Sequence, residues 1–295
     1  MRVAFLGPEG TFTEEALRAS VRGSVEELPY PTVREAVMAV QDGDAERAVV
    51  PIENALEGSV RATLDTLAAE APDVRIEAQV THPIRHCLIA RRELELAQIE
   101  VVISHPQASA QCARFIRVEL PEAQVRAAPS TADAVREVAG EDRPWAALGG
   151  AAAARIYNCM VLREGVEDDA DNVTRFVWLA PGPPHGAASP GDSPQRPADV
   201  ATKTSIVFWG FDDYSPGALV GVLSELAQRG VNLSKIESRP RRVRLGHYMF
   251  FADLEGARDD PPVRDALAAL GARVETLKVL GSYAADATLA DDRGG

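Results

Sequence analysis

The chain has 295 residues, a net charge of −13 at pH 7 and a hydrophobic fraction of 46%. This length is typical of two domains, and the hydrophobic fraction excludes a disordered chain because it supplies enough residues for buried cores. The negative charge excludes non-specific binding to nucleic acid, which requires a basic surface, although a small anion can still bind in a locally positive pocket.

The start of the sequence and the cysteines predict a cytoplasmic protein. The opening segment MRVAFLGPEG contains one basic residue and no long apolar stretch, so we expect neither a signal peptide nor a membrane anchor. Cys87, Cys112 and Cys159 are odd in number and far apart in the sequence. Their spacing favours reduced thiols over a disulfide framework or a zinc site.

Short apolar runs alternate with helical patterns over residues 1–180. The predicted strands cover residues 2–7, 47–53, 101–106 and 145–150, and each run ends in turn residues. Predicted helices cover residues 11–21, 32–43 and 130–140. The first begins with Thr11 and carries Glu14 three residues later, which is a capping-box pattern. This βα alternation predicts parallel strands flanked by helices, arranged as one large sheet or as two lobes.

A change in composition separates this region from the next. Eleven of the seventeen residues from Pro181 to Pro197 are Pro, Gly or Ser, which predicts a linker over residues 181–203. Residues 204–283 then give the order strand, helix, strand, strand, helix, strand. This βαββαβ order is typical of a ferredoxin-like domain. Residues 284–295 are small and polar, and we expect a flexible tail.

Two motifs follow the first two predicted strands. GPEGTFTEEA, residues 7–16, joins a strand to a helix, so its backbone N–H groups favour an anion site, although an ordinary tight turn has the same pattern. In PIENALEGSV, residues 51–60, Asn54 can donate and accept hydrogen bonds or simply stabilise the turn. We expect Gly58 and Ser59 at the start of the next helix.

Two further motifs lie at later strand ends. SHPQASAQCARF, residues 104–115, is expected to expose Ser104, His105 and Gln107, and His105 is either a catalytic acid or, more commonly, a His–Pro turn residue. In DNVTRFVWLA, residues 171–180, Thr174 and Arg175 are neighbours on a strand and face opposite sides. Burial of Arg175 requires either a bound anion or a salt bridge, for example to Asp171 or Glu167.

The four motifs together predict a site for a small anionic molecule. All lie at strand ends, where α/β sheets place their ligands. They supply backbone N–H groups, amides, hydroxyls and one arginine. They lack a Ser–His–Asp arrangement, metal-ligand spacing and a reactive cysteine setting.

These motifs, with STADAVREV, closely resemble the ordered motifs of prephenate dehydratases. GALVGVLSEL and ESRP resemble two signature stretches of the ACT regulatory domain attached to those enzymes. The resemblance covers nearly the whole chain except the linker and tail. It implies an α/β fold in which a two-lobed catalytic domain, similar to periplasmic binding proteins, precedes a ferredoxin-like ACT domain. Family members often have Ser where this chain has Ala55, so no contact through that hydroxyl is expected.

The resemblance also implies an activity and its site residues. Prephenate would lose CO₂ and water to give phenylpyruvate, without a metal or an organic cofactor. Thr174 matches the essential family residue and would assist departure of hydroxide, while Arg175 would bind a carboxylate. The remaining predicted substrate-binding residues are Thr11, Asn54, Ser104 and Phe176.

The ACT resemblance implies control by L-phenylalanine. Paired ACT domains in a homodimer or homotetramer would hold the amino acid at their interface. The residues implied in binding are Gly217, Ala218, Leu219, Val220, Glu237, Ser238, Arg239 and Pro240. Two alternative functions fit the same sequence: an arogenate dehydratase, whose substrate carries an amino group, and a non-catalytic sensor of aromatic amino acids.

Overall fold

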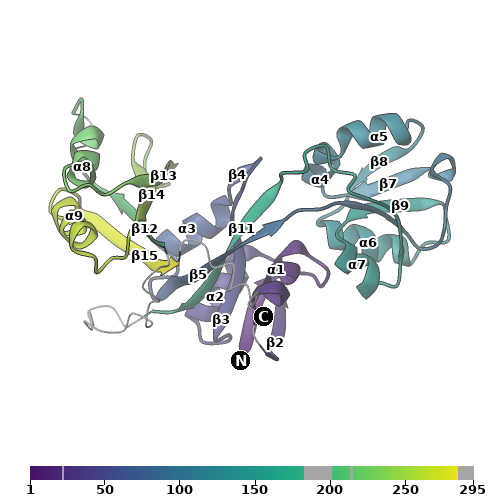
Figure 1. The fold of residues 1–295 in the computed structure, drawn as a ribbon, viewed down its shortest axis with the longest axis horizontal. Coiled ribbons are helices and arrows are strands. Elements are labelled where there is room, and N and C mark those ends of the chain that lie inside the picture. Colours follow the sequence, from purple (N-terminus) through teal and green to yellow (C-terminus); the bar gives the residue numbers. More distant parts are fainter. Residues whose placement is uncertain (22, 183–200, 213–214, 285–295) are drawn as a thin grey trace, which may run out of the picture. The chain divides into compact units, whose positions relative to one another are not determined.

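The computed structural model describes residues 1–21, 23–182, 201–212 and 215–284 (Figure 1). These residues form two compact units, each of which combines separate segments of the chain. The first unit comprises residues 1–36, 49–60 and 81–176, and the second comprises residues 37–48, 61–80 and 177 onward. Most of the predicted linker (183–200) and nearly all of the predicted tail (285–295) lie outside the described residues.

Part of a larger sheet contains strands from the two ends of the predicted catalytic domain. Its strands follow the order β11-β3-β1-β2, with the short β4 beside β3. β1 and β2 are parallel, as the predicted βα alternation requires. The strands are β1 (Arg2–Leu6), β2 (Glu26–Tyr30), β3 (Arg47–Asn54), β4 (Gly58–Ser59) and β11 (Val173–Pro181). Helices α1 (Phe12–Ser20) and α2 (Val33–Gln41) connect the first three strands.

The expectation that Gly58 and Ser59 begin a helix was wrong. They form β4, which folds back antiparallel to β3 with Ser59 opposite Glu53 and Gly58 opposite Asn54. The following helix, α3 (Arg61–Ala69), begins only after this hairpin. Asn54 therefore lies at a tight turn. The backbone N–H of Ala55 donates to the Val173 carbonyl, and that of Val60 donates to the Ile52 carbonyl.

A second sheet of the first unit has the order β10-β6-β9-β7-β8. Helices α4 and α5 lie on one side and α6 and α7 on the other (Figure 1). Alternate strand residues explain this: Ile103 packs with Val135 of α6, while Val102 packs with Cys112 next to α4. The two sheets correspond to the two lobes that the sequence allowed.

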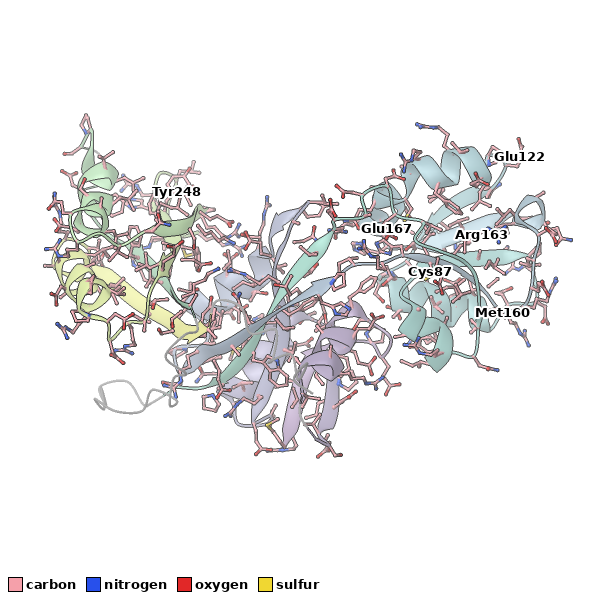
Figure 2. All side chains as sticks on the ribbon, in the orientation of Figure 1. Cys87, Glu122, Met160, Arg163, Glu167 and Tyr248 are labelled. Carbon is pink, nitrogen blue, oxygen red and sulfur yellow. The ribbon has the colours of Figure 1, made fainter. Side chains whose placement is uncertain are left out.

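The elements of this second lobe are short. They are β6 (Cys87–Ala90), η1 (Leu96–Gln98), β7 (Val101–Ser104), α4 (Pro106–Gln111), α5 (Ala113–Glu119), β8 (Gln124–Ala127), α6 (Thr131–Ala139), β9 (Trp145–Gly149), α7 (Ala151–Ile156) and β10 (Met160–Glu164). Cys87 of β6 is buried in this lobe (Figure 2), and burial raises its pKa to about 11. Within the described residues, no helix is long and apolar enough to cross a membrane.

The C-terminal part has the predicted βαββαβ order, and the mixed α/β fold class is confirmed. Its strands are arranged as β13-β14-β12-β15, with α8 and α9 packed on a shared core that contains Phe208, Leu226 and Leu270. The elements are β12 (Thr202–Trp209), α8 (Ala218–Ala227), β13 (Leu233–Pro240), β14 (Tyr248–Glu255), α9 (Pro261–Gly271) and β15 (Thr276–Ala284).

Helix α3 belongs to the second unit because the C-terminal strands bind it directly. Lys278 of β15 donates hydrogen bonds to the carbonyls of Leu67 and Ala71, at 2.7 and 2.9 Å. Burial lowers the pKa of Lys278 to about 8. Arg239 of β13 forms two hydrogen bonds to the carboxylate of Asp65, each 2.7 Å long. Two strands of the C-terminal sheet are thus tied to one helix.

Gly281 lies where β15 meets β5 (Val74–Pro83), the strand that follows α3. Gly281 pairs with Ile76, and a Cβ atom on Gly281 would lie 2.2 Å from the Ile76 carbonyl oxygen. Only a residue without a side chain allows the two backbones to approach so closely.

We therefore expect Gly281→Ala to lower the free energy of unfolding by about 1–3 kcal/mol, the usual cost of overpacking. Urea unfolding followed by circular dichroism measures the change. Gly140→Ala is the matched control, because its Cβ would meet no atom closer than 3.5 Å. Equal stabilities of the two variants would contradict the close approach.

Candidate active site

The first unit contains a cavity of about 1030 Å³. Its lining comes from the ends of β1 and β3, the start of β11, and the first turns of α1, α4 and α6. Four predicted site residues line it: Thr11, Asn54, Thr174 and Phe176. Ser104 and Arg175 are not among the lining residues.

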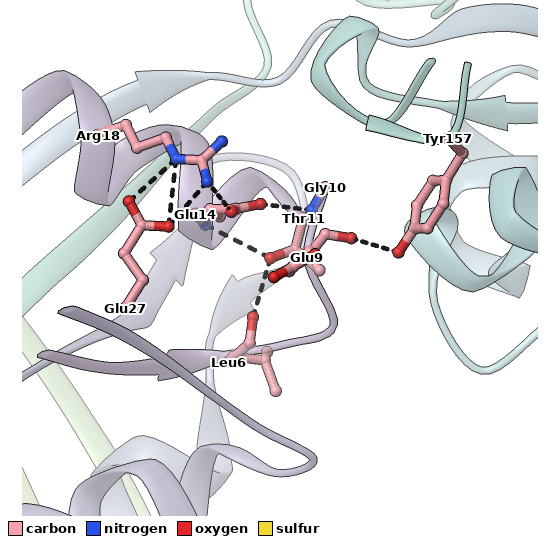
Figure 3. A network of polar contacts seen from close by, with 8 residues as sticks. All are labelled: Leu6, Glu9, Gly10, Thr11, Glu14, Arg18, Glu27 and Tyr157. Atoms are coloured by element: carbon pink, nitrogen blue, oxygen red, sulfur yellow. Dashed lines mark hydrogen bonds and ion pairs between the residues drawn. The ribbon is translucent and has the colours of Figure 1, made fainter. Parts of the chain in front are cut away.

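The turn before α1 is held by its own side chains (Figure 3). Thr11 caps the helix: its Oγ1 accepts from the Glu14 backbone N–H at 3.4 Å and donates to the Leu6 carbonyl at 2.9 Å. The second half of the predicted capping box was wrong, because the buried Glu14 carboxylate accepts from the N–H of Gly10 rather than from that of Thr11. Burial raises the pKa of Glu14, and the Gly10 N–H and Arg18 oppose this rise.

The same turn contacts the second lobe. The hydroxyl of Tyr157, the residue that ends α7, donates to the Glu9 carbonyl at 2.9 Å (Figure 3). Gly10 has a φ of +87°, and a Cβ there would lie 3.0 Å from Cα and Cβ of Ala153. Both the positive φ angle and the close approach of the two lobes therefore favour glycine at this position.

Asn54 has a fixed orientation. Its Oδ1 accepts from the backbone N–H groups of Leu56 and Glu57, both at 3.0 Å. Because these are donors, the opposite side of the amide must be the NH₂ group. That group donates to Asn172 Oδ1 at 2.8 Å and to Thr174 Oγ1 at 2.9 Å.

Thr174 is buried and lines the cavity. Its Oγ1 accepts from Asn54, so the hydroxyl proton is directed to another acceptor. Phe176, two residues along β11, faces the same side, as strand periodicity predicts. Thr174 and Phe176 therefore both line the cavity, whereas Arg175 between them does not.

Arg175 projects on the other side of β11. Its Nη2 lies 3.4 Å from Glu53 Oε2, and its side chain is 12% exposed. The ion-pair interpretation of this arginine is supported, but the partner is Glu53 rather than Asp171 or Glu167. Glu53 lies on β3, the neighbouring strand, so the pair links the two strands that carry Asn54 and Thr174.

The motif that begins at Ser104 contributes differently from the prediction. Ser104 is fully buried instead of exposed, because its hydroxyl donates to the Leu148 carbonyl on the adjacent β9 at 2.8 Å. His105 begins α4, and its Nδ1 accepts from the Gln107 backbone N–H at 3.3 Å. This is the capping role of a His–Pro turn residue. His105, Gln107 and Gln111 reach the cavity in place of Ser104.

The sequence analysis missed several cavity residues. His86 is 2% exposed, and no motif marked it because it lies in a loop before β6 without any periodic pattern. Ser130 and Thr131 begin α6, where the Ser130 hydroxyl accepts from the Asp133 N–H at 2.9 Å. The start of this helix was predicted correctly. Only the fold shows that its first turn lines the same cavity as the first turn of α1.

The predicted phenylalanine-binding residues lie in the second unit. Gly217, with a φ of +83°, precedes α8, and Val220 in its first turn is 67% exposed. On β13, Ser238 and Pro240 are exposed, whereas Arg239 is buried against Asp65. Alternation along the strand thus separates Arg239 from its two neighbours.

Comparisons with known proteins agree with this architecture. The chain matches the family model for prephenate dehydratase over residues 3–183 and the model for the ACT domain over residues 215–272. Prephenate dehydratases from Mycolicibacterium vanbaalenii and Mycobacterium tuberculosis are each 39% identical to it. The alignments cover 95% and 96% of this chain, and 90% and 87% of those proteins.

Solved structures give the same result. Prephenate dehydratase from Arthrobacter aurescens, in complex with L-Phe, has a TM-score of 0.85 and 39% identity, over 96% of this chain and 90% of that chain. A structure reported as a novel type of quorum-quenching acylase has a TM-score of 0.83 and 30% identity, over 97% and 99% of the two chains. The resemblance seen in the motifs is confirmed, and the chain belongs to the prephenate dehydratase family.

Proposed function

We propose that the cavity around Thr174 binds prephenate and converts it into phenylpyruvate. The observation that supports this most directly is the direction of the hydrogen bond between Asn54 and Thr174. Asn54 can only donate to the threonine oxygen, which leaves the hydroxyl proton of this cavity-lining residue for another acceptor, and we assign that acceptor to the substrate. The reaction needs a donor of this kind at the leaving oxygen.

The chemistry explains the need. The bond between the ring and its carboxylate breaks to release CO₂, and the electron pair moves through the ring. The bond to the ring hydroxyl breaks at the other end, and the departing hydroxide takes up a proton to become water. The ring becomes aromatic, so the barrier lies in departure of hydroxide. Thr174 would stabilise the developing negative charge on this oxygen by donating a hydrogen bond, while the cavity holds the ring in place.

The two carboxylates of prephenate need positive partners. The first turns of α1 and α6 both line the cavity at Phe12 and Thr131, and helix geometry leaves their N–H groups without partners inside the helix. Arg136 of α6 also lines the cavity. We assign carboxylate binding to these groups. Arg175, which was predicted for this role, instead holds β3 to β11 through Glu53.

We further propose that L-phenylalanine regulates the enzyme through the ACT domain. The related Arthrobacter aurescens enzyme was solved in complex with L-Phe. Val220, Ser238 and Pro240 are exposed, and pairing of two ACT domains in a homodimer or homotetramer would bury them around the effector. Arg239 would not contact the effector, because Asp65 already holds its guanidinium. The free thiols agree with a cytoplasmic enzyme.

Thr174→Ala should lower kcat by about 10²–10⁴-fold, the usual effect of losing a catalytic hydrogen-bond donor. Formation of phenylpyruvate from prephenate, followed by ultraviolet absorbance, measures the loss. Thr174→Ser is the matched control, because it keeps the hydroxyl and should retain most of the turnover. A kcat of Thr174→Ala near that of the wild-type enzyme would contradict the role of Thr174.

The same assay separates the alternative functions. Arogenate, supplied at equal concentration, tests for an arogenate dehydratase, and an N-acyl amide tests for the acylase activity reported for the structural relative. Turnover of prephenate with a higher kcat/KM than either compound supports the proposal. Absence of turnover with all three compounds would leave a non-catalytic sensor.

Val220→Arg should abolish inhibition by L-phenylalanine while preserving activity in its absence. The arginine would place a charge in the proposed effector interface, removing a coupling of about 1–3 kcal/mol. Activity with and without L-phenylalanine, together with the molecular mass from sedimentation, measures the effect. Val243→Arg is the control, because Val243 is 77% exposed and lies outside both motifs. Unchanged inhibition of Val220→Arg would place the effector site elsewhere.

A further inference from the structure

His86 is a buried histidine in the wall of the cavity. Its backbone is fixed on both sides: the N–H donates to Glu167 Oε2 at 2.8 Å, and the carbonyl accepts from the Val166 N–H at 3.0 Å (Glu167 is labelled in Figure 2). Its ring meets the ring of Phe12 edge-on, with 5.4 Å between the centroids. The side chain is therefore held in one place.

A line of hydrogen bonds connects this ring to Thr174. His86 Nε2 lies 3.1 Å from Gln111 Oε1, and Asn172 Nδ2 donates to the same oxygen at 3.1 Å. Asn172 Oδ1 in turn accepts from Asn54 Nδ2, which also donates to Thr174. His86, Gln111 and Asn172 come from three separate segments of the first unit.

The orientation of Asn54 determines which atom donates and which accepts in every hydrogen bond of this line. Backbone N–H groups fix Asn54, so Asn54 donates to Asn172 Oδ1. Asn172 must then present its NH₂ group to Gln111, whose oxygen is the acceptor. An oxygen can only accept, so His86 must carry its proton on Nε2. Within the described residues His86 Nδ1 is buried without a hydrogen-bond partner, as expected of the unprotonated nitrogen.

We propose that His86 is a positioning residue for the dehydration, a role that rests on the proposed function of Thr174. A carboxamide can rotate and exchange its oxygen and its NH₂ group. The His86 N–H favours the orientation in which the Gln111 oxygen faces Asn172. Asn172 then keeps its oxygen toward Asn54 and reinforces the orientation in which Asn54 donates to Thr174, which the backbone N–H groups of Leu56 and Glu57 also favour. His86 acts through these amides and does not contact Thr174.

Burial lowers the pKa of His86, which is consistent with a neutral ring. A charged ring would carry a second N–H group at Nδ1, where the described residues offer no acceptor. The neutral ring supplies the one donor that the Gln111 oxygen needs and avoids the cost of burying a charge.

Three substitutions test the role. His86→Gln can place an N–H group near the position of Nε2, whereas His86→Asn reaches only to the position of Nδ1, and His86→Leu has no donor. We expect kcat to fall on the order of tenfold in the Asn and Leu variants, the rate equivalent of one hydrogen bond. KM should stay within about twofold because the residue does not bind substrate. The Gln variant should recover most of the loss.

Urea midpoints show whether each variant is folded, and the Asn variant keeps the test valid if Leu does not fold. The inference fails if the folded Asn variant keeps the kcat of the wild type, or if Gln is as impaired as Asn. It also fails if the loss appears in KM, since His86 would then bind substrate directly.

The tautomer gives a second, independent measurement. Imidazole ¹⁵N chemical shifts of the uniformly labelled wild-type enzyme, with the His86 signals assigned by their loss in His86→Gln, should show a protonated Nε2 and an unprotonated Nδ1. A proton on Nδ1 would overturn the inference. Thr174→Ala separates the two proposals: if it keeps turnover, the proposed function fails. If it is inactive while His86→Asn matches the wild type, only the role of His86 fails.

Discussion

The orientation of the Asn54 amide is the constraint on which the hydrogen bonds around Thr174 and the proposed chemistry depend. Two backbone N–H groups in the turn after β3 hold its oxygen, so its NH₂ group is left to face Thr174 and Asn172. A threonine hydroxyl is a weak acid, so in the proposed reaction Thr174 would act through the direction of its hydrogen bond rather than through acidity. The hairpin formed by β3 and β4 is what places the two N–H groups, so a local turn sets the polarity of the site.

Regular elements were predictable because their signals are local. Strand runs ended in turn residues, and Thr11 and Ser130 marked helix starts that the structure confirms. The cavity was predictable only in part. Asn54 and Thr174 are 120 residues apart, and nothing local shows that they meet. Ser104 looked exposed because its neighbours His105 and Gln107 are polar, but an adjacent strand accepts its hydroxyl. The ion pair of Arg175 with Glu53 was not predictable, because Glu53 lies on a distant segment of the chain.

Helix α3 follows a residue of the cavity lining in the sequence and binds a strand of the ACT domain. Val60, just before it, lines the cavity, and Asp65 within it binds Arg239 of the ESRP motif. Arg242 also approaches Asp65, at 2.8 Å, so one carboxylate serves two arginines. Removing this carboxylate would leave Arg239 buried without its partner, which costs more than the loss of an exposed ion pair. The attachment therefore contributes to the stability of the second unit.

The alternation along β11 has a consequence for how such sequences can diverge. Thr174 and Phe176 line the cavity while Arg175 pairs with Glu53 on the opposite face. Insertion or deletion of a single residue in this strand would exchange the two faces, moving the arginine into the cavity and the threonine away from Asn54. Residues added to the loop before Asn172 would leave this alternation unchanged. The spacing from Asn172 to Phe176 therefore fixes which side chains of this strand reach the cavity.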